Sequence, residues 1–174
     1  MGRKLHIGGK QQKEGWEILD AENRPEVDHV CNAKKLSCFP DNTFESVYAS
    51  HVLEHINYGK ETVDVLKEWR RVLIPEGKLY ISVPDMDICC SLFLNKQLSF
   101  QDRFEAMRFL FGGHTNEFDF HHSGINKEIL SSYLHEAGFV RGEHLENQSF
   151  GIFIDSSAFK FRGVHISLNI IAYK

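Results

Sequence analysis

The chain of 174 residues is long enough to bury one hydrophobic core and too short for two ordinary domains. Its composition, 42% hydrophobic and 25% charged, is typical of a globular protein, and it has no run of 18 apolar residues that would span a membrane. The formal charge of -4 argues against a general nucleic-acid surface, which requires a basic face. We therefore expect one domain, residues 1–174, with neither a membrane nor a nucleic acid as its general partner.

Cysteine usage points to a reducing compartment. The chain has four cysteines, Cys31, Cys38, Cys89 and Cys90. Their spacing contains no C-x-x-C pair, so it predicts neither a zinc ribbon nor a redox motif. We expect reduced thiols and a cytoplasmic protein, and Met1–Ile7 lacks the long apolar stretch of a secretory signal.

The chain begins with a short predicted strand, Lys4–Ile7, that runs into Gly8 and Gly9. Glycines just past a strand allow the backbone to approach a ligand closely. Only Lys10–Gly15 separates them from the next predicted strand, Trp16–Asp20, whereas a parallel crossover normally needs a dozen or more residues. Either the crossover is a bare loop or the first strand is paired differently, and both alternatives lack the usual first helix.

The ends of the next two strands carry polar residues. Asp20 ends the second strand, where an acidic residue in nucleotide-binding α/β folds binds the ribose hydroxyls; capping a turn is the alternative. Val27–Cys31 is a weaker strand candidate, followed by Asn32 and Ala33. Asn32 has a carbonyl that can accept a hydrogen bond from a ligand, and it can also cap the turn into Lys34–Cys38.

The stretch FPDNTFESVYASHVLEH, residues 39–55, indicates a turn, a strand and a loop. Pro40–Asn42 is a turn signal, and Val47–Ala49 has the unalternating apolar character of a strand buried on both faces. Ser50–His55 is then the loop leaving the carboxyl end of this strand. In open α/β sheets, ligands bind at that end.

Three helices follow from apolar spacing and caps. The first covers Thr62–Leu73, with its charges, including Arg70 and Arg71, on a solvated face, and Pro75 and Gly77 stop it before the strand Lys78–Val83. Ser99 opens a second helix to about Phe111 through a capping box, and Asn126 caps a third, Lys127–Glu136. Val140–Leu145 and His165–Tyr173 are the last strands, joined by a long connection, Glu146–Gly163, of the kind that is often functional or mobile.

Four segments resemble one family. FPDNTFESVYASHVLEHI resembles the fourth-strand region of class I S-adenosylmethionine-dependent methyltransferases, and LKEWRRVLIPEG (66–77), KLYISVP (78–84) and LHEAGF (134–139) resemble its later motifs in order. The likeness is to small, type 11-like members that accompany polysaccharide-synthesis genes. It implies an α/β fold with a Rossmann-like, open, twisted, mostly parallel sheet of about seven strands and a shortened amino-terminal part. It also implies that residues 86–125 are an inserted helical and loop region on the acceptor side.

The resemblance implies S-adenosylmethionine as the cofactor. This sequence departs from the family at His6, which replaces the usual acid of the glycine-rich loop, and at Asn32, which replaces the adenine-binding acid but keeps a carbonyl acceptor. The cofactor-binding residues that we predict are Gly8, Gly9, Asp20, Asn32, Ala33, Ser50 and His51.

Methyl transfer to a hydroxyl requires a positioned acceptor and a base, for which histidine is the default. His51 lies just past the fourth strand, with packing or capping as its alternative role. His114, Asp119, His121 and His122 form a second group, in which the Asp can raise the basicity of an imidazole. The catalytic candidates are His51, Asp119, His121 and His122. The second group also resembles a metal-binding set, but its spacing matches no known motif, so we predict no metal.

Two functions remain open from the sequence. The first is an S-adenosylmethionine-dependent methyltransferase acting on a small-molecule acceptor, for which a sugar hydroxyl is our interpretation of the resemblance. The second is a non-catalytic binding or regulatory module, which the degenerate glycine loop favours. An RNA substrate is disfavoured by the net charge, with Arg70 and Arg71 as its one local basic patch. The oligomeric state is open, a homodimer being one alternative.

Overall fold

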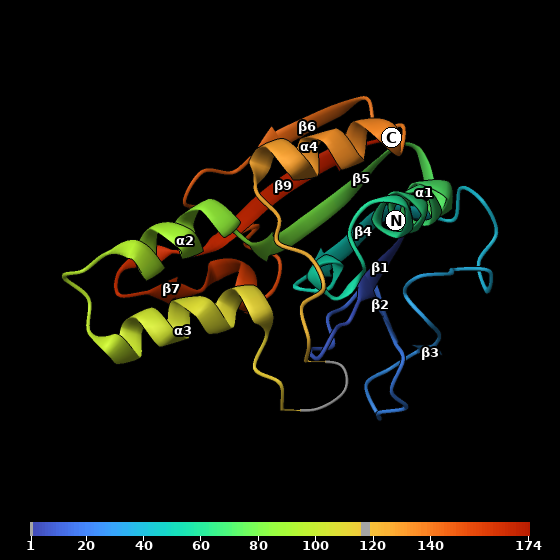
Figure 1. Cartoon of the computed structure of the whole chain (residues 1–174). Coiled ribbons are helices and arrows are strands. Elements are labelled where there is room, and N and C mark those ends of the chain that lie inside the picture. Colours follow the sequence, from blue (N-terminus) through green and yellow to red (C-terminus); the bar gives the residue numbers. More distant parts are fainter. Residues whose placement is uncertain (1, 116–118) are drawn as a thin grey trace.

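The computed structural model describes residues 2–115 and 119–174, and its centre is one seven-stranded sheet in the order β3-β2-β1-β4-β5-β9-β6 (Figure 1). Neighbouring strands from β3 to β5 pair in parallel, and β9 runs antiparallel between β5 and β6. The strands are β1 (Arg3–Ile7), β2 (Trp16–Asp20), β3 (His29–Val30), β4 (Phe44–Ser50), β5 (Leu73–Pro84), β6 (Arg141–His144) and β9 (Ser167–Tyr173). The predicted mostly parallel α/β sheet is confirmed.

Two helices begin at the predicted N-caps. Ser99 accepts a hydrogen bond from the Asp102 amide, and Asn126 accepts one from the Ile129 amide, as N-caps. The helices are α1 (Lys60–Val72), α2 (Met86–Leu94), α3 (Phe100–Phe111) and α4 (Lys127–Glu136), with 3-10 turns η1 (Leu53–His55) and η2 (Ser156–Ala158). Helix α2 and the small hairpin of β7 (Lys160–Phe161) and β8 (Val164–His165) were not predicted. No described helix combines the length and apolarity that crossing a bilayer requires.

The crossover from β1 to β2 is a bare loop. Lys4 lies opposite Trp16 and Ile7 opposite Leu19 in a parallel ladder, so the first strand has its usual neighbour. The described residues 8–15 between the strands contain no helix. Gly8 adopts φ 71° and donates its amide to the Leu19 carbonyl at 2.8 Å, which turns the chain at once. The alternative of a differently paired first strand is wrong.

One face of the sheet is aliphatic and lies under helices α1 and α4. Because successive side chains of a strand point to opposite faces, one set of strand residues contacts the helices and the other does not. The buried cluster against the helices contains Leu5, Ile7, Leu19, Val47, Ala49, Leu79, Ile81, Leu66, Trp69, Leu130 and Leu134. Trp69 is fully buried and also donates its indole N–H to the Ala33 carbonyl at 2.9 Å.

The opposite face carries aromatic residues and is covered by the long connection. His6, Tyr48 and Phe153 pack together, with the His6 and Phe153 ring centroids 4.1 Å apart. The Tyr48 hydroxyl donates to the Asp155 carboxylate at 2.7 Å, which joins the sheet to η2. The segment expected to be functional or mobile, Glu146–Gly163, therefore packs on the sheet. It covers the face opposite helices α1 and α4.

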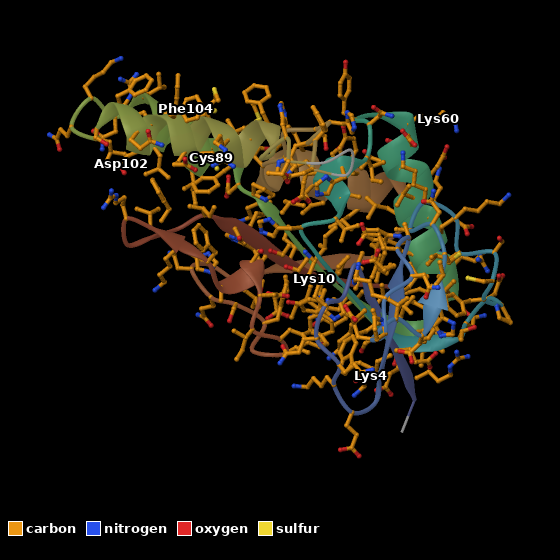
Figure 2. All side chains as sticks on the ribbon, turned by 90° about the horizontal axis from the view of Figure 1, so that it is seen from below. Lys4, Lys10, Lys60, Cys89, Asp102 and Phe104 are labelled. Carbon is orange, nitrogen blue, oxygen red and sulfur yellow. The ribbon has the colours of Figure 1, made fainter. Side chains whose placement is uncertain are left out.

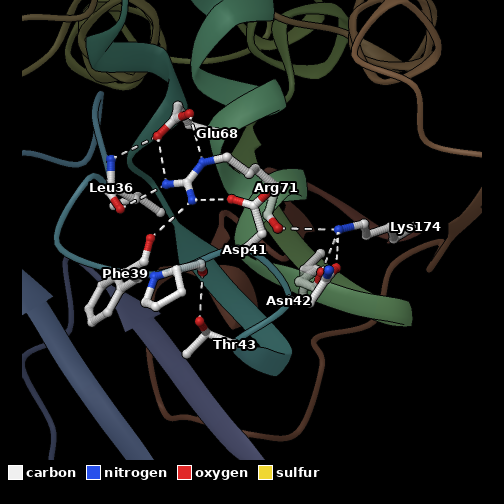
Figure 3. A network of polar contacts seen from close by, with 10 residues as sticks. Leu36, Phe39, Asp41, Asn42, Thr43, Glu68, Arg71 and Lys174 are labelled. Carbon is white, nitrogen blue, oxygen red and sulfur yellow. Dashed lines mark hydrogen bonds and ion pairs between the residues drawn. The ribbon is translucent and has the colours of Figure 1, made fainter.

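The two arginines at the end of α1 are bound within the chain rather than solvated. The Arg71 guanidinium donates to the Glu68 and Asp41 carboxylates and to the carbonyls of Leu36 and Phe39 (Figure 3). Arg70 donates to the Gly138 carbonyl at 2.8 Å. In the same network, the Lys174 ammonium donates to Asn42 and to the carbonyls of Arg71 and Leu73. The expectation of a purely solvated face is wrong at these positions, and the basic patch that an RNA substrate needed loses its support.

Candidate functional site

The predicted cofactor residues share one edge of the sheet. Ile7 lies opposite Leu19 and Ala49, and Asp20 lies opposite Val30, so these strands end at the same level. Asn32, Asp20, Gly8 and Ser50 consequently follow one another in this order along the carboxyl edge, where α/β sheets bind their ligands.

The glycine pair packs tightly against its own protein. A Cβ at Gly8 would lie 2.9 Å from the Val52 side chain, and one at Gly9 would lie 2.8 Å from the His6 ring. His6 is 5% exposed, and burial lowers its pKa to about 4 although the nearby Asp155 carboxylate opposes the shift. A neutral, buried imidazole thus stands where the resemblance expected an acid, and it acts as a packing residue under the glycines.

Asp20 lies beside the glycine pair but already has partners. Its carboxylate accepts from the Glu22 amide at 2.9 Å through Oδ1 and from Arg24 at 2.9 Å through Oδ2. Arg24 also donates to the Gly9 carbonyl at 2.9 Å, so it bridges Asp20 and the glycine loop. Neither of the two described pockets borders Asp20 or the glycines. The ribose role of Asp20 stays a prediction, because each of its oxygens already accepts one hydrogen bond.

The remaining cofactor candidates differ in availability. The Asn32 side-chain carbonyl accepts from the Lys34 amide at 2.9 Å, so the turn-capping role that was one alternative is present. The Ala33 carbonyl accepts from Trp69. The Ser50 hydroxyl is buried and has no hydrogen-bond partner among the described residues. An orphaned hydroxyl at the carboxyl end of β4 is available to a ligand.

A cavity of about 270 Å³ opens beyond the carboxyl ends of β4 and β5. It brings together three of the four catalytic candidates, His51, Asp119 and His121, whereas His122 is exposed and does not line it. The lining residues are His51, Pro84, Glu105, Arg108, Phe109, Gly112, Gly113, Asp119, His121 and Ile166. Helix α3 thus forms one wall.

Helices α2 and α3 lie side by side beside this cavity. Figure 2 shows Cys89 on α2 and Asp102 and Phe104 on α3, at one end of the molecule. Arg162, in the β7–β8 hairpin, pairs with the Asp102 carboxylate at 2.7 Å and ties the hairpin to α3. The segment 86–125 therefore supplies the cavity with a wall that is anchored from a distant part of the chain.

Asp119 stabilises its own loop rather than an imidazole. It accepts from the Thr115 amide at 3.1 Å and from the Thr115 hydroxyl at 2.6 Å, and the hydroxyl contact lowers its pKa to about 2. Asp119 acts on His121 in the expected direction, but burial and the neighbouring His55 lower the pKa of His121 to about 4. Asp119 therefore raises the basicity of His121 as expected, but burial outweighs its effect. Asn116–Phe118 of this histidine-rich segment lie outside the described residues.

His51 has both ring nitrogens engaged. The Ser167 hydroxyl donates to the Ser156 carbonyl at 2.8 Å, so its oxygen accepts from His51 Nε2–H at 3.0 Å. His51 Nδ1 therefore carries the lone pair, and it lies 3.3 Å from a carboxylate oxygen of Glu54. Burial lowers the pKa of His51 to about 4.

Sequence reasoning did not single out Glu54, and it expected His55 to face the helix or solvent rather than this cluster. Glu54 is 1% exposed, neither of its carboxylate oxygens has a hydrogen-bond partner among the described residues, and burial raises its pKa to about 8. One ligand atom each of Glu54, His55 and His121 lies within 4.8 Å of the others. The adjacent Glu-His pair was visible in the sequence, but its contact with His121 depends on the fold. We call His51, Glu54, His55 and His121 the histidine–glutamate cluster.

Comparisons with known proteins relate both the sequence and the fold of this chain to methyltransferases. Residues 11–81 match the model of a family described as a methyltransferase domain, and the curated proteins gave no significant match. The chain resembles a possible exported protein from Bordetella parapertussis with a TM-score of 0.60 and 12% identity, over 99% of this chain and 62% of that one. It spans 48% of the structure of the CurJ carbon methyltransferase.

Two further structures are named methyltransferases. A S-adenosylmethionine-dependent methyltransferase from Methanosarcina mazei has a TM-score of 0.59 and 19% identity, over 99% of this chain and 92% of that one. The 1,6-didemethyltoxoflavin-N1-methyltransferase of Burkholderia thailandensis, with bound S-adenosylhomocysteine, has a TM-score of 0.59 and 14% identity, over 99% of this chain and 71% of that one. At these identities the likeness concerns the fold. The family match covers residues 11–81, and the solved structures share with this chain the α/β fold of S-adenosylmethionine-dependent methyltransferases.

Proposed function

We propose that this chain transfers a methyl group from S-adenosylmethionine to a small-molecule acceptor held in the 270 Å³ cavity. The observation that carries the proposal is that a cavity with His51 and His121 in its wall opens at the same sheet edge as Gly8 and Asp20. In-line transfer requires the methyl group and the accepting atom to approach within about 3–3.5 Å. A cofactor held by Gly8 and Asp20 and an acceptor held in the cavity would lie at neighbouring strand ends, which suits such an approach.

The residues of the sheet edge suit the cofactor. S-adenosylmethionine, when bound, supplies the reactive methyl group. Each carboxylate oxygen of Asp20 accepts one hydrogen bond from the described residues and keeps a lone pair for a ribose hydroxyl, and the orphaned Ser50 hydroxyl is a second polar contact. Asn32 and Ala33 stand in the adenine positions, and the positive φ of Gly8 keeps the backbone close to the ligand.

The acceptor that we propose is a small polar molecule with a hydroxyl group, such as a sugar. The cavity has a volume near the lower end of ligand sites, and Glu105 and Arg108 offer both a hydrogen-bond acceptor and a donor. A hydroxyl must lose its proton during transfer. The histidine–glutamate cluster, which reaches the cavity through His51 and His121, is the group that we assign to this step.

The test compares two neighbouring histidines. His121→Ala is expected to lower methyl transfer by at least about 100-fold while the affinity for S-adenosylhomocysteine stays nearly unchanged. His122→Ala, at an exposed position outside the cavity, is the matched control and is expected to retain activity. Turnover is measured as S-adenosylhomocysteine release with a panel of hydroxylated acceptors, and affinity by calorimetry. Loss of cofactor affinity in His121→Ala would show that the segment is structural.

A non-catalytic binding module is the second candidate. The observation that favours it is Arg24, which engages both the Asp20 carboxylate and the Gly9 carbonyl and so occupies groups that the cofactor needs. The same calorimetry separates the two. Binding of neither S-adenosylmethionine nor S-adenosylhomocysteine favours the module, whereas a methylated product with any acceptor establishes the enzyme.

A further inference from the structure

Glu54 is a buried carboxylate without a counter-charge. It is 1% exposed, and both carboxylate oxygens lack a hydrogen-bond donor among the described residues. Its position is nevertheless fixed, because its backbone carbonyl accepts from the amides of His122 at 2.7 Å and Ser123 at 3.2 Å. A buried carboxylate in this state is costly unless a proton or a cation neutralises it.

The imidazoles of His55 and His121 each keep one ring nitrogen with a lone pair that a cation can bind. His55 Nδ1 lies 3.0 Å from the Phe120 carbonyl, and His121 Nδ1 lies 3.1 Å from the Phe109 carbonyl. A carbonyl only accepts, so both Nδ1 atoms carry the hydrogen and both Nε2 atoms keep a lone pair. Metal-binding histidines are held in this way, with the other ring N–H donated to a carbonyl.

We propose that Glu54, His55 and His121 bind one divalent transition-metal cation. Two histidines and one carboxylate are a common ligand set for Zn²⁺ and related cations, and this set leaves coordination positions open. The three ligand atoms lie within 4.8 Å of one another, so small side-chain rotations bring them to the usual distances of roughly 2.0–2.2 Å from a shared ion. His51 Nδ1, 3.3 Å from Glu54, borders the same space.

His121 also lines the 270 Å³ cavity, so an open coordination position faces the bound acceptor. This part of the inference rests on the proposed methyl transfer. There, a bound cation would bind the acceptor oxygen and ease the loss of its proton, and this is how the histidine–glutamate cluster would assist the step assigned to it. The cation site itself depends only on the cluster.

A proton is the rival to a metal ion. A protonated Glu54 would donate to the His51 Nδ1 lone pair and neutralise the same charge without any cation. The two explanations differ in whether the chain takes up metal, and in which side chains that uptake needs.

The experiment titrates the chelator-treated chain with MnCl₂ and, separately, with ZnCl₂. Binding is measured by calorimetry and, for Mn²⁺, by electron paramagnetic resonance. We expect one equivalent to bind and the thermal unfolding midpoint to rise. Glu54→Gln and His121→Ala are expected to weaken binding by at least about tenfold. Glu54→Gln removes a buried charge and is expected to fold, and His55→Ala is the second ligand variant.

Two controls locate the ion. His122→Ala keeps the segment but lies outside the cluster, so binding should persist. Cys31 and Cys38 have sulfurs 3.1 Å apart and are the competing Zn²⁺ site, so Cys38→Ser should also retain binding. Absence of Mn²⁺ and Zn²⁺ binding, or binding that is unchanged in Glu54→Gln and His121→Ala, overturns the proposal. S-adenosylhomocysteine titrated into the same samples tests the proposed function separately.

Discussion

The two faces of the sheet are covered in different ways. Helices α1 and α4 lie on an aliphatic face, whereas the connection from 146 to 163 covers the other face, with Phe150 and Phe153 packed edge-to-face against the Tyr48 ring. The helix-covered face is a continuous apolar contact. The loop-covered face contains buried polar atoms without a partner among the described residues, including His6 Nδ1, Ser82 Oγ and Asn169 Oδ1. The helical face thus provides regular packing, and the loop-covered face keeps polar groups beside the ligand edge.

The largest effect is expected from the helix-covered face. Trp69 is fully buried between α1 and the sheet, so Trp69→Ala removes its contacts and leaves a cavity between regular elements that cannot easily close. We expect a loss of about 3–5 kcal/mol in the free energy of unfolding. Urea unfolding followed by circular dichroism measures this loss. A loss below about 1 kcal/mol would contradict the assignment of the main core to this face.

A smaller effect is expected from the loop-covered face. Phe153 is 6% exposed, but it lies in an irregular segment that can collapse toward the sheet after truncation. Phe153→Ala should cost less than Trp69→Ala, roughly 3 kcal/mol or below. Hydrogen exchange should rise in the described connection and stay unchanged in α1. An equal loss of protection in the connection and in α1 of Phe153→Ala would mean that the two faces unfold as one unit.

The smallest effect is a change in pH dependence. Burial holds the pKa of His6 at about 4 in the folded chain, against 6.5 for a free imidazole. The folded state binds this proton less readily, so its contribution to stability is complete above pH 6.5 and is lost as the pH falls through about 4. His6→Phe should therefore reduce the fall in the free energy of unfolding between pH 6.5 and about 4, which we call the acid limb.

The control for His6 is the exposed His135, where His135→Phe should leave the acid limb unchanged. Fluorescence-detected urea unfolding at a series of pH values provides the comparison. An acid limb that is the same in His6→Phe and in the natural chain would show that His6 is not the group responsible.

The regular half of the fold was predictable, and the reason is periodicity. The α1 segment has an apolar stripe, and Ser99 and Asn126 mark helix starts through their side-chain caps. Helix α2 was missed because Met86–Leu94 is apolar on nearly every side and has no stripe. The β7–β8 hairpin was missed because strands of two residues carry no periodic signal.

The candidate site was predictable only in its local parts. Strand ends marked Gly8, Asp20 and Ser50, because parallel strands bring their carboxyl ends to one edge. The contact of Glu54 and His55 with His121 joins segments far apart in the chain, so no spacing rule indicated it. Neighbours in the sequence were also misleading, since His121 lines the cavity and the adjacent His122 is exposed.

The most direct test of the account is a calorimetric titration of S-adenosylhomocysteine into the natural chain, Asp20→Asn and Glu22→Gln. Glu22 is another partner of Arg24, so Glu22→Gln controls for disturbance of that arginine. The account predicts binding to the natural chain, an affinity at least about tenfold weaker in Asp20→Asn, and little change in Glu22→Gln. No binding to the natural chain, or equal affinity in Asp20→Asn, would contradict it.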